Sequence, residues 1–209
     1  MIRHTLARLT LCGALIAGLA SPALAGPPLV CFPFDIGTAT SLPWNSSSGS
    51  YKGMRSDYDL ERLNRDTIAL LTPSTPVLVR METLRRAALY ASANERTARG
   101  LLDSLLARAK ASTDSKTSLA EFDLGYLIET YRQLEPIAPF ASAIVKDLDG
   151  YGMVRRSLDE RHGDPAIAFA AALITSDGKS SAHAEHVRMA KAGAPADMLL
   201  ARNLDHVGP

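Results

Sequence analysis

The residues with the clearest capacity for chemistry are the two histidines of the run His183-Ala-Glu-His186. Histidines at positions i and i+3 project from one face of a helix and can share a metal ion. Asp159 and His162 have the same spacing at the end of an earlier predicted helix, and they would complete a set of four ligands. The candidate metal ligands are therefore His183, His186, His162 and Asp159.

A structural role is the alternative interpretation of this pair. His183 aligns with Val187 and Ala190 on the face expected to point inward, where a core histidine would bond a backbone carbonyl. The run also lacks the H-E-x-x-H order that places a carboxylate base beside zinc-bound water. His206, near the C-terminus, is a further possible ligand.

Other catalytic signatures are missing from the sequence. It contains no G-x-S-x-G motif and no glycine-rich loop that would hold a phosphate. We therefore predict no catalytic residue and no cofactor. Two pairs of adjacent arginines, each balanced by a carboxylate, are expected on solvated outer helix faces: Arg85-Arg86 with Glu82, and Arg155-Arg156 with Asp159.

Composition places the chain among ordinary globular proteins, with 46% hydrophobic and 22% charged residues in 209. Its 23 Lys+Arg nearly balance 22 Asp+Glu. This balance argues against a nucleic-acid partner or an anionic membrane partner, because both require an excess of positive charge. A chain of this length buries roughly 70% of its unfolded surface, which is enough for one stable core.

Residues 1–25 have the pattern of a secretory signal. Two arginines precede an apolar run over 9–20, and the segment ends in a small-residue Ala-Leu-Ala pattern. We predict cleavage before Gly26 and a soluble product in the periplasm or outside the cell. No membrane span is expected, because the apolar run is shorter than the ~20 residues that a crossing helix needs.

Cleavage would leave Cys31 as the lone cysteine of the mature chain. The fold must then be stable without an internal disulfide. Cys31 itself is open to three interpretations, which are a small buried hydrophobe, a partner in an intermolecular disulfide, and a reactive thiol.

The segment 26–56 differs from the rest of the chain, because it is rich in proline, serine and glycine and has no helical period. Phe32, Phe34 and Ile36 alternate with more polar or turn-forming residues, a pattern of period two. We predict an extended strap packed on the helical body, anchored at its far end by Trp44 and followed by a flexible linker.

From residue 57 to 209 the apolar period is near 3.6, which indicates one helical domain. Several helix starts are expected from capping residues: Asp59, Thr75-Pro76, Ser92 with Glu95, Ser118 with Glu121, and Asp164-Pro165. The fold class is therefore predicted to be all-α, with seven or eight short helices in antiparallel pairs. These helices would form either a solenoid-like stack or an irregular bundle.

Two resemblances accompany this assignment. The start Gly26-Pro-Pro-Leu-Val-Cys31, followed by Pro33-Phe-Asp-Ile-Gly37, resembles the mature opening of an uncharacterised group of exported bacterial helical proteins, which implies export but no activity. The helices around 81–110 resemble tetratricopeptide-type helical repeats in their small residues and helix lengths, although they do not keep the 34-residue repeat.

Three functions remain open from the sequence. The first is a binding or scaffolding protein without catalytic activity, whose partner is a protein or peptide segment. The second is a metal-binding protein or metal-dependent enzyme that uses His183 and His186. The third is a structural protein of the periplasm that self-associates through its strap.

Overall fold

The all-α prediction is confirmed. A computed structural model describes residues 26–45, 52–112, 119–176 and 181–208, and within these ranges the chain forms helices and no β-strand. The helices are α1 (Pro28–Cys31), α2 (Leu63–Leu70), α3 (Val77–Ala91), α4 (Glu95–Ala111), α5 (Ala120–Gln133), α6 (Pro139–Ile144), α7 (Gly150–Glu160), α8 (Pro165–Ile174), α9 (Ser181–Gly193) and α10 (Met198–Asn203). Short 3₁₀ helices cover Leu60–Arg62, Ala194–Ala196 and Leu204–Val207.

The described ranges hold more helices than the seven or eight predicted. One addition is α1, a single helical turn inside the proline-rich strap. The region 139–160 forms two helices, α6 and α7. None of the described helices is both long enough and apolar enough to cross a membrane.

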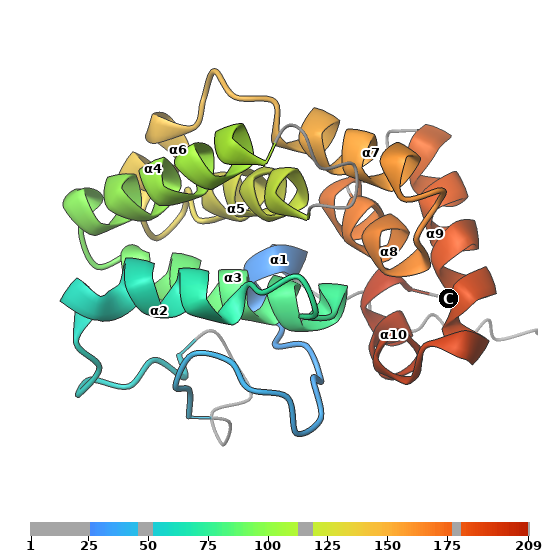
Figure 1. Ribbon diagram of the computed structural model, residues 1–209, viewed down its shortest axis with the longest axis horizontal. Coiled ribbons are helices and arrows are strands. Elements are labelled where there is room, and N and C mark those ends of the chain that lie inside the picture. The colour runs from blue at the N-terminus through green and yellow to red at the C-terminus, as the bar shows by residue number, and fades with distance from the viewer. Residues whose placement is uncertain (1–25, 46–51, 113–118, 177–180, 209) are drawn as a thin grey trace, which may run out of the picture.

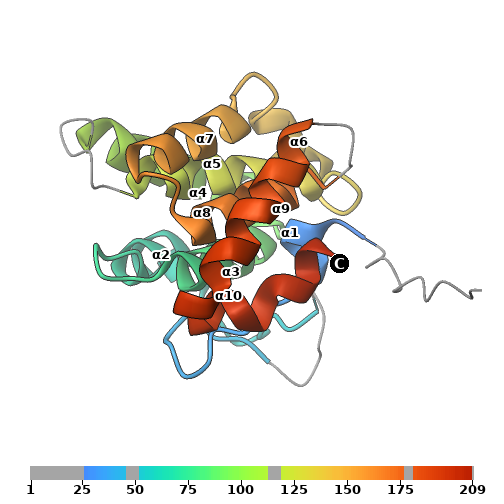
Figure 2. The same ribbon diagram turned by 90° about the vertical axis from the view of Figure 1, so that its right-hand side faces the viewer.

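The helices form an irregular bundle. In Figure 1, α2 and α3 lie beneath α4 and α5, while α7, α8 and α9 gather at the opposite end of the molecule. Helix α5 packs against α1, α3, α4, α6, α7 and α8, and Figure 2 shows α9 lying across α8. In a solenoid each helix pair would touch only its neighbours, so this central helix selects the bundle from the two predicted arrangements.

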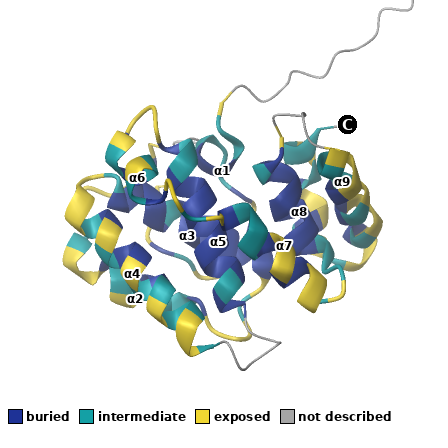
Figure 3. Cartoon of the chain, turned by 90° about the horizontal axis from the view of Figure 1, so that it is seen from above, coloured by how far each residue is buried: buried dark blue, intermediate teal, exposed yellow. Residues whose placement is uncertain are grey.

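Three helices make up most of the core. Almost every residue of α3, α5 and α8 is buried, whereas α2, α4 and α7 each present one exposed face (Figure 3). Helix α8 is apolar throughout, as a buried helix should be. Helices α3 and α5 instead carry charged residues into the interior, so those charges must find partners there.

Two glycines allow α5 and α7 to cross closely. A Cβ on Gly125 would lie 2.6 Å from the Gly150 carbonyl oxygen, and one on Gly150 would lie 2.7 Å from that of Gly125. A larger residue at either position would push the two helices apart.

Two of the predicted helix starts are confirmed. Asp59 accepts a hydrogen bond from the Glu61 amide at 3.0 Å, and Asp164 accepts one from the Ala166 amide at 3.0 Å. Pro165 follows as the first residue of α8. Aspartate followed by proline thus begins this helix as the cap preference predicts.

Two other predicted starts were wrong. Ser92 ends α3, where its hydroxyl donates to the Leu89 carbonyl, and Asn94 caps α4 by accepting from the Thr97 amide at 2.9 Å. The Thr75 hydroxyl donates to the Leu70 carbonyl, so it serves the preceding turn and does not cap α3. The cap predicted at Ser118 lies outside the described residues.

A buried ion pair fixes the turn between α2 and α3. The Nη1 atom of Arg80 lies 2.6 Å from Oδ2 of Asp123 on α5, and the same guanidinium donates to the carbonyls of Thr72 and Thr75. Arg108 adds a second guanidinium 3.7 Å from Asp123. Burial raises the pKa of Asp123 to about 6, although both arginines act to lower it.

This raised pKa predicts an unusual pH dependence of stability. Because Asp123 binds its proton more tightly in the folded chain than in the unfolded chain, its contribution to the free energy of unfolding should increase as the pH falls from about 6 to about 4. The gain is at most about 3 kcal/mol. Asp123→Asn has the charge of the protonated carboxyl at every pH, so it should remove this pH dependence.

Urea unfolding between pH 4 and pH 7 measures the effect. Asp147→Asn, a change at an exposed carboxylate, serves as the control. Its free energy of unfolding should vary with pH as that of the wild type does. If the free energy of unfolding of Asp123→Asn varies with pH as that of the wild type does, Asp123 is not the source of the pH dependence.

Candidate functional site

The most connected polar group in the core is the carboxylate of Glu82, in the middle of α3. Its Oε2 atom accepts from Nε of Arg85 at 2.7 Å, and its Oε1 atom accepts from Nη2 of Arg85 at 2.9 Å and from Nε of Arg86 at 2.6 Å. The side chains of Glu82 and Arg85 are both 0% exposed. The prediction that Arg85, Arg86 and Glu82 form a solvated outer face was therefore wrong.

The strap covers this face of α3 and bonds to the ionic cluster through its main chain. The Phe34 amide donates to Glu82 at 3.1 Å. Arg85 donates to the Val30 carbonyl at 3.0 Å, and Arg86 donates to the Leu42 carbonyl at 2.7 Å. Each member of the cluster thus holds one point of the strap's backbone.

Side chains from two other helices extend this pattern. Gln133 at the end of α5 accepts from the Leu29 amide at 2.8 Å. Asn203 at the end of α10 makes a pair of bonds with Asp35, accepting from its amide at 2.8 Å and donating to its carbonyl at 2.9 Å. The helical body therefore bonds main-chain groups of the strap, both in the turn α1 and beyond it, and such groups are common to all residue types.

Apolar side chains of the strap fill the core beneath these bonds. Phe34 and Ile36 are buried on either side of the exposed Asp35, and Phe34 meets Phe169 of α8 edge to face at 6.0 Å between ring centroids. Leu29 and Leu42 are also buried. These side chains belong to the same hydrophobic core as the helices.

Trp44 lies at the far end of the described strap. Its ring is half-buried, meets Tyr90 edge to face at 5.9 Å and carries the Arg85 guanidinium 4.9 Å above it. Such a cation–π contact adds about 1 kcal/mol where it is partly desolvated. The arginine that binds the strap's backbone thus also holds its tryptophan.

The two histidines of the candidate metal motif have different partners. Nδ1 of His183 lies 3.1 Å from the Ala172 carbonyl oxygen, which accepts a hydrogen bond from the ring. Nε2 of His186 lies 2.9 Å from the Tyr151 hydroxyl. Burial lowers the pKa of His186, and the nearby Arg155 adds to this effect. His183 thus has the carbonyl bond that the structural interpretation requires.

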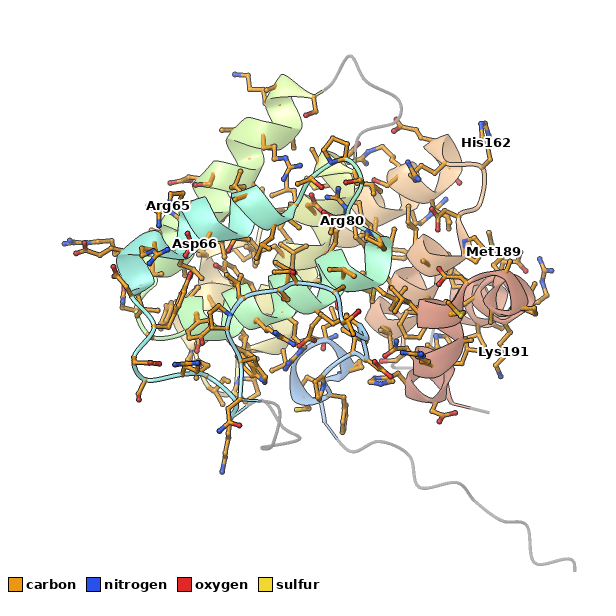
Figure 4. All side chains as sticks on the ribbon, turned by 60° about the horizontal axis from the view of Figure 1, so that its bottom comes forward. Arg65, Asp66, Arg80, His162, Met189 and Lys191 are labelled. Carbon is orange, nitrogen blue, oxygen red and sulfur yellow. The ribbon has the colours of Figure 1, made fainter. Side chains whose placement is uncertain are left out.

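The other two candidate ligands lie on the surface. Asp159 and His162 are exposed, and Figure 4 shows His162 pointing away from the body. In the described part of the chain, no three His, Cys, Asp or Glu side chains are grouped so that they could hold a metal ion. The structure therefore does not bring His183, His186, His162 and Asp159 together.

Cys31 ends α1 and is partly exposed. Burial raises the pKa of its thiol, and the charge of Arg85 opposes this effect. A raised pKa favours the protonated thiol, the less nucleophilic form.

Comparisons with protein-family models, with curated proteins and with solved structures find no match to this chain.

The charge pattern alone predicts a solvated face for Glu82, Arg85 and Arg86, and so it misses their bonds to the strap. A better indication was available in α3, where apolar residues occur all around the helix and Leu78 and Leu89 share the side of Glu82, Arg85 and Arg86. A helix of this kind is buried, so charges within it must pair with one another or with backbone groups. The spacing of Glu82 to Arg85 and Arg86 at i+3 and i+4 is the one that allows such pairing.

We predict that Glu82→Gln strongly destabilises the chain. The change preserves shape but leaves Arg85 buried without a counter-charge, which typically costs 3–5 kcal/mol. Glu95→Gln is the matched control, because it removes the carboxylate of the exposed Glu95–Arg99 pair and should cost less than about 1 kcal/mol. Chemical denaturation of both variants measures the two losses, and equal losses would contradict the prediction.

Proposed function

We propose that the mature chain is an exported binding or scaffolding protein whose helical body holds an extended polypeptide segment. The observation that supports this proposal is the set of side chains on α3, α5 and α10 that bond the strap's main chain. In this view the strap occupies the binding site of its own helical body. The partner is a protein or peptide segment that presents its backbone in the same way.

Backbone bonds of this kind give affinity without selecting a sequence, and selection then comes from the side chains between them. In the strap these are buried apolar residues at Leu29, Phe34 and Leu42. A partner segment therefore needs apolar residues at the corresponding positions. Polar or charged residues there would lose the burial that stabilises the contact.

Self-association is a second candidate function, favoured by one feature of the same bonds. They join residues far apart in the chain, since Phe34 and Glu82 are separated by 48 positions and Asp35 and Asn203 by 168. A strap from a second copy would offer the same backbone groups. Exchange of straps between two copies would then give a symmetric dimer.

A peptide-binding experiment tests the proposal. Phe34→Ser in the mature chain should weaken the chain's own strap while leaving Glu82, Arg85 and Gln133 in place. A fluorescent peptide with the sequence of residues 26–45 should bind this variant more tightly than the wild-type chain, as measured by anisotropy. A peptide of the same composition with its apolar residues shifted by one position is the control.

Failure of the 26–45 peptide to bind a helical Phe34→Ser chain would refute the proposal. Circular dichroism establishes that the variant is folded. Sedimentation of the wild-type chain over a range of concentrations separates the two candidates, because strap exchange between copies predicts a dimer.

Export is the second part of the proposal, and it rests on the pattern of residues 1–25. Expression of the full chain in a bacterium should give a product whose N-terminal residue is Gly26, found in the periplasm or the medium. Mass spectrometry of the purified protein identifies this residue. A full-length product that stays in the cytoplasm would contradict it.

A further inference from the structure

The C-terminal end of the described chain closes over the strap. Residues 203–207, which we call the latch, contain Asn203 and the 3₁₀ helix Leu204–Val207. Asn203 bonds both main-chain groups of Asp35. Three residues later, the His206 ring packs against Phe34 of the strap with 5.2 Å between ring centroids.

His206 lies in a cluster of phenylalanine rings. Besides Phe34, it meets Phe32 of the strap at 6.3 Å and Phe169 of α8 at 6.5 Å, both edge to face. Its ring therefore joins the strap to the core helix α8. The latch thus holds the strap by a pair of backbone bonds from Asn203 and by one aromatic ring.

The protonation state of this ring matters because of its Nδ1 atom. Nδ1 is buried and has no hydrogen-bond partner among the residues that the structure describes. A neutral imidazole with its proton on Nε2 leaves only a lone pair at Nδ1, whereas a charged imidazolium carries an N–H on both nitrogens. Protonation would therefore place a charged donor among phenylalanine rings without an acceptor, which is costly.

We propose that the latch is an acid-sensitive lock on the strap. When His206 takes up a proton, its ring leaves the phenylalanine cluster and the latch detaches, so Asp35 loses its bonds to Asn203. The strap around Phe32 and Phe34 then becomes free to separate from α8. This device is independent of the partner that the helical body binds.

The charges around His206 set the direction of the effect. Burial lowers its pKa, Arg85 adds to this lowering, and Asp205 and Glu82 oppose it. Helix α8 contributes no ionisable side chain. Helix α9, which also packs against the latch, carries His183, Glu185, His186, Arg188 and Lys191. The remaining titratable or charged groups on the strap and on α10 are Cys31, Asp35 and Arg202.

Because the closed latch favours neutral His206, it is fully stable above the ordinary histidine pKa of about 6.5 and weakens as the pH falls. Between that value and the lowered pKa of the closed state, the opening equilibrium should increase up to about tenfold per pH unit.

Amide hydrogen exchange of the mature chain, corrected for the intrinsic effect of pH, tests this inference. Protection of residues 32–36 should fall as the pH is lowered from 7.5 to 5. His206→Phe keeps an aromatic ring but cannot be protonated, so the loss of protection at residues 32–36 on lowering the pH should disappear. His162→Asn removes an exposed histidine at a residue with φ 54°, where asparagine is tolerated, and should behave like the wild type.

Constant protection of residues 32–36 in the wild-type chain would overturn the proposal, as would a His206→Phe chain with the wild-type pH dependence. An NMR titration of the histidine ring protons in the wild-type chain gives a second test that needs no variant. The pKa of His206 should lie below the ordinary histidine value of about 6.5, and a pKa at or above that value would also overturn the proposal.

Discussion

The burial of the Glu82 carboxylate among two arginines is the constraint on which the rest of the structure depends. A carboxylate without a charged partner could not remain ionised at this depth. Its partners Arg85 and Arg86 keep donors for further bonds, and these reach the backbone of the strap. The ion cluster and the strap therefore stabilise each other, because each satisfies polar groups that the other buries.

Two other carboxylate–arginine pairs bond the backbone of an irregular segment in the same way. Asp123 pairs with Arg80, which donates to carbonyls of the α2–α3 turn. Glu129 on α5 pairs with Arg132, which donates to the Leu148 carbonyl ahead of α7, and Glu129 accepts from the Tyr151 amide at 2.9 Å. In each case a carboxylate holds an arginine in place, and the arginine serves the backbone of an irregular segment. Lysine could not replace it, because a single ammonium lacks the planar fork of donors that reaches both partners.

The sequence predicted the fold class and the helix starts at Asp59 and Asp164, whereas the starts predicted at Thr75 and Ser92 were wrong. Asp59 and Asp164 act within two or three residues of themselves, so spacing alone was enough. The bond between Glu82 and the strap could not be predicted in the same way, because its donor, the Phe34 amide, is 48 residues away in the sequence.

The histidine pair illustrates the same limit. The i, i+3 spacing correctly indicates two side chains on neighbouring turns of one helix. What each histidine meets depends on α8 for His183 and on α7 for His186, and these helices present a carbonyl and a phenol. Spacing can therefore propose ligands, but only the packing of separate helices brings a complete set together.

Coupling between the strap and the ion cluster also limits what can replace the strap. An empty site would leave Glu82 without the Phe34 amide and would leave donors of Arg85 and Arg86 without carbonyls, all in a buried region. A replacing segment must therefore supply a carbonyl and an amide four residues apart, as Val30 and Phe34 do, and a second carbonyl where Leu42 now lies. A continuous helix would bond the first carbonyl and the amide to each other, so the site favours a segment whose backbone leaves the helical path between them, as the strap does after Cys31.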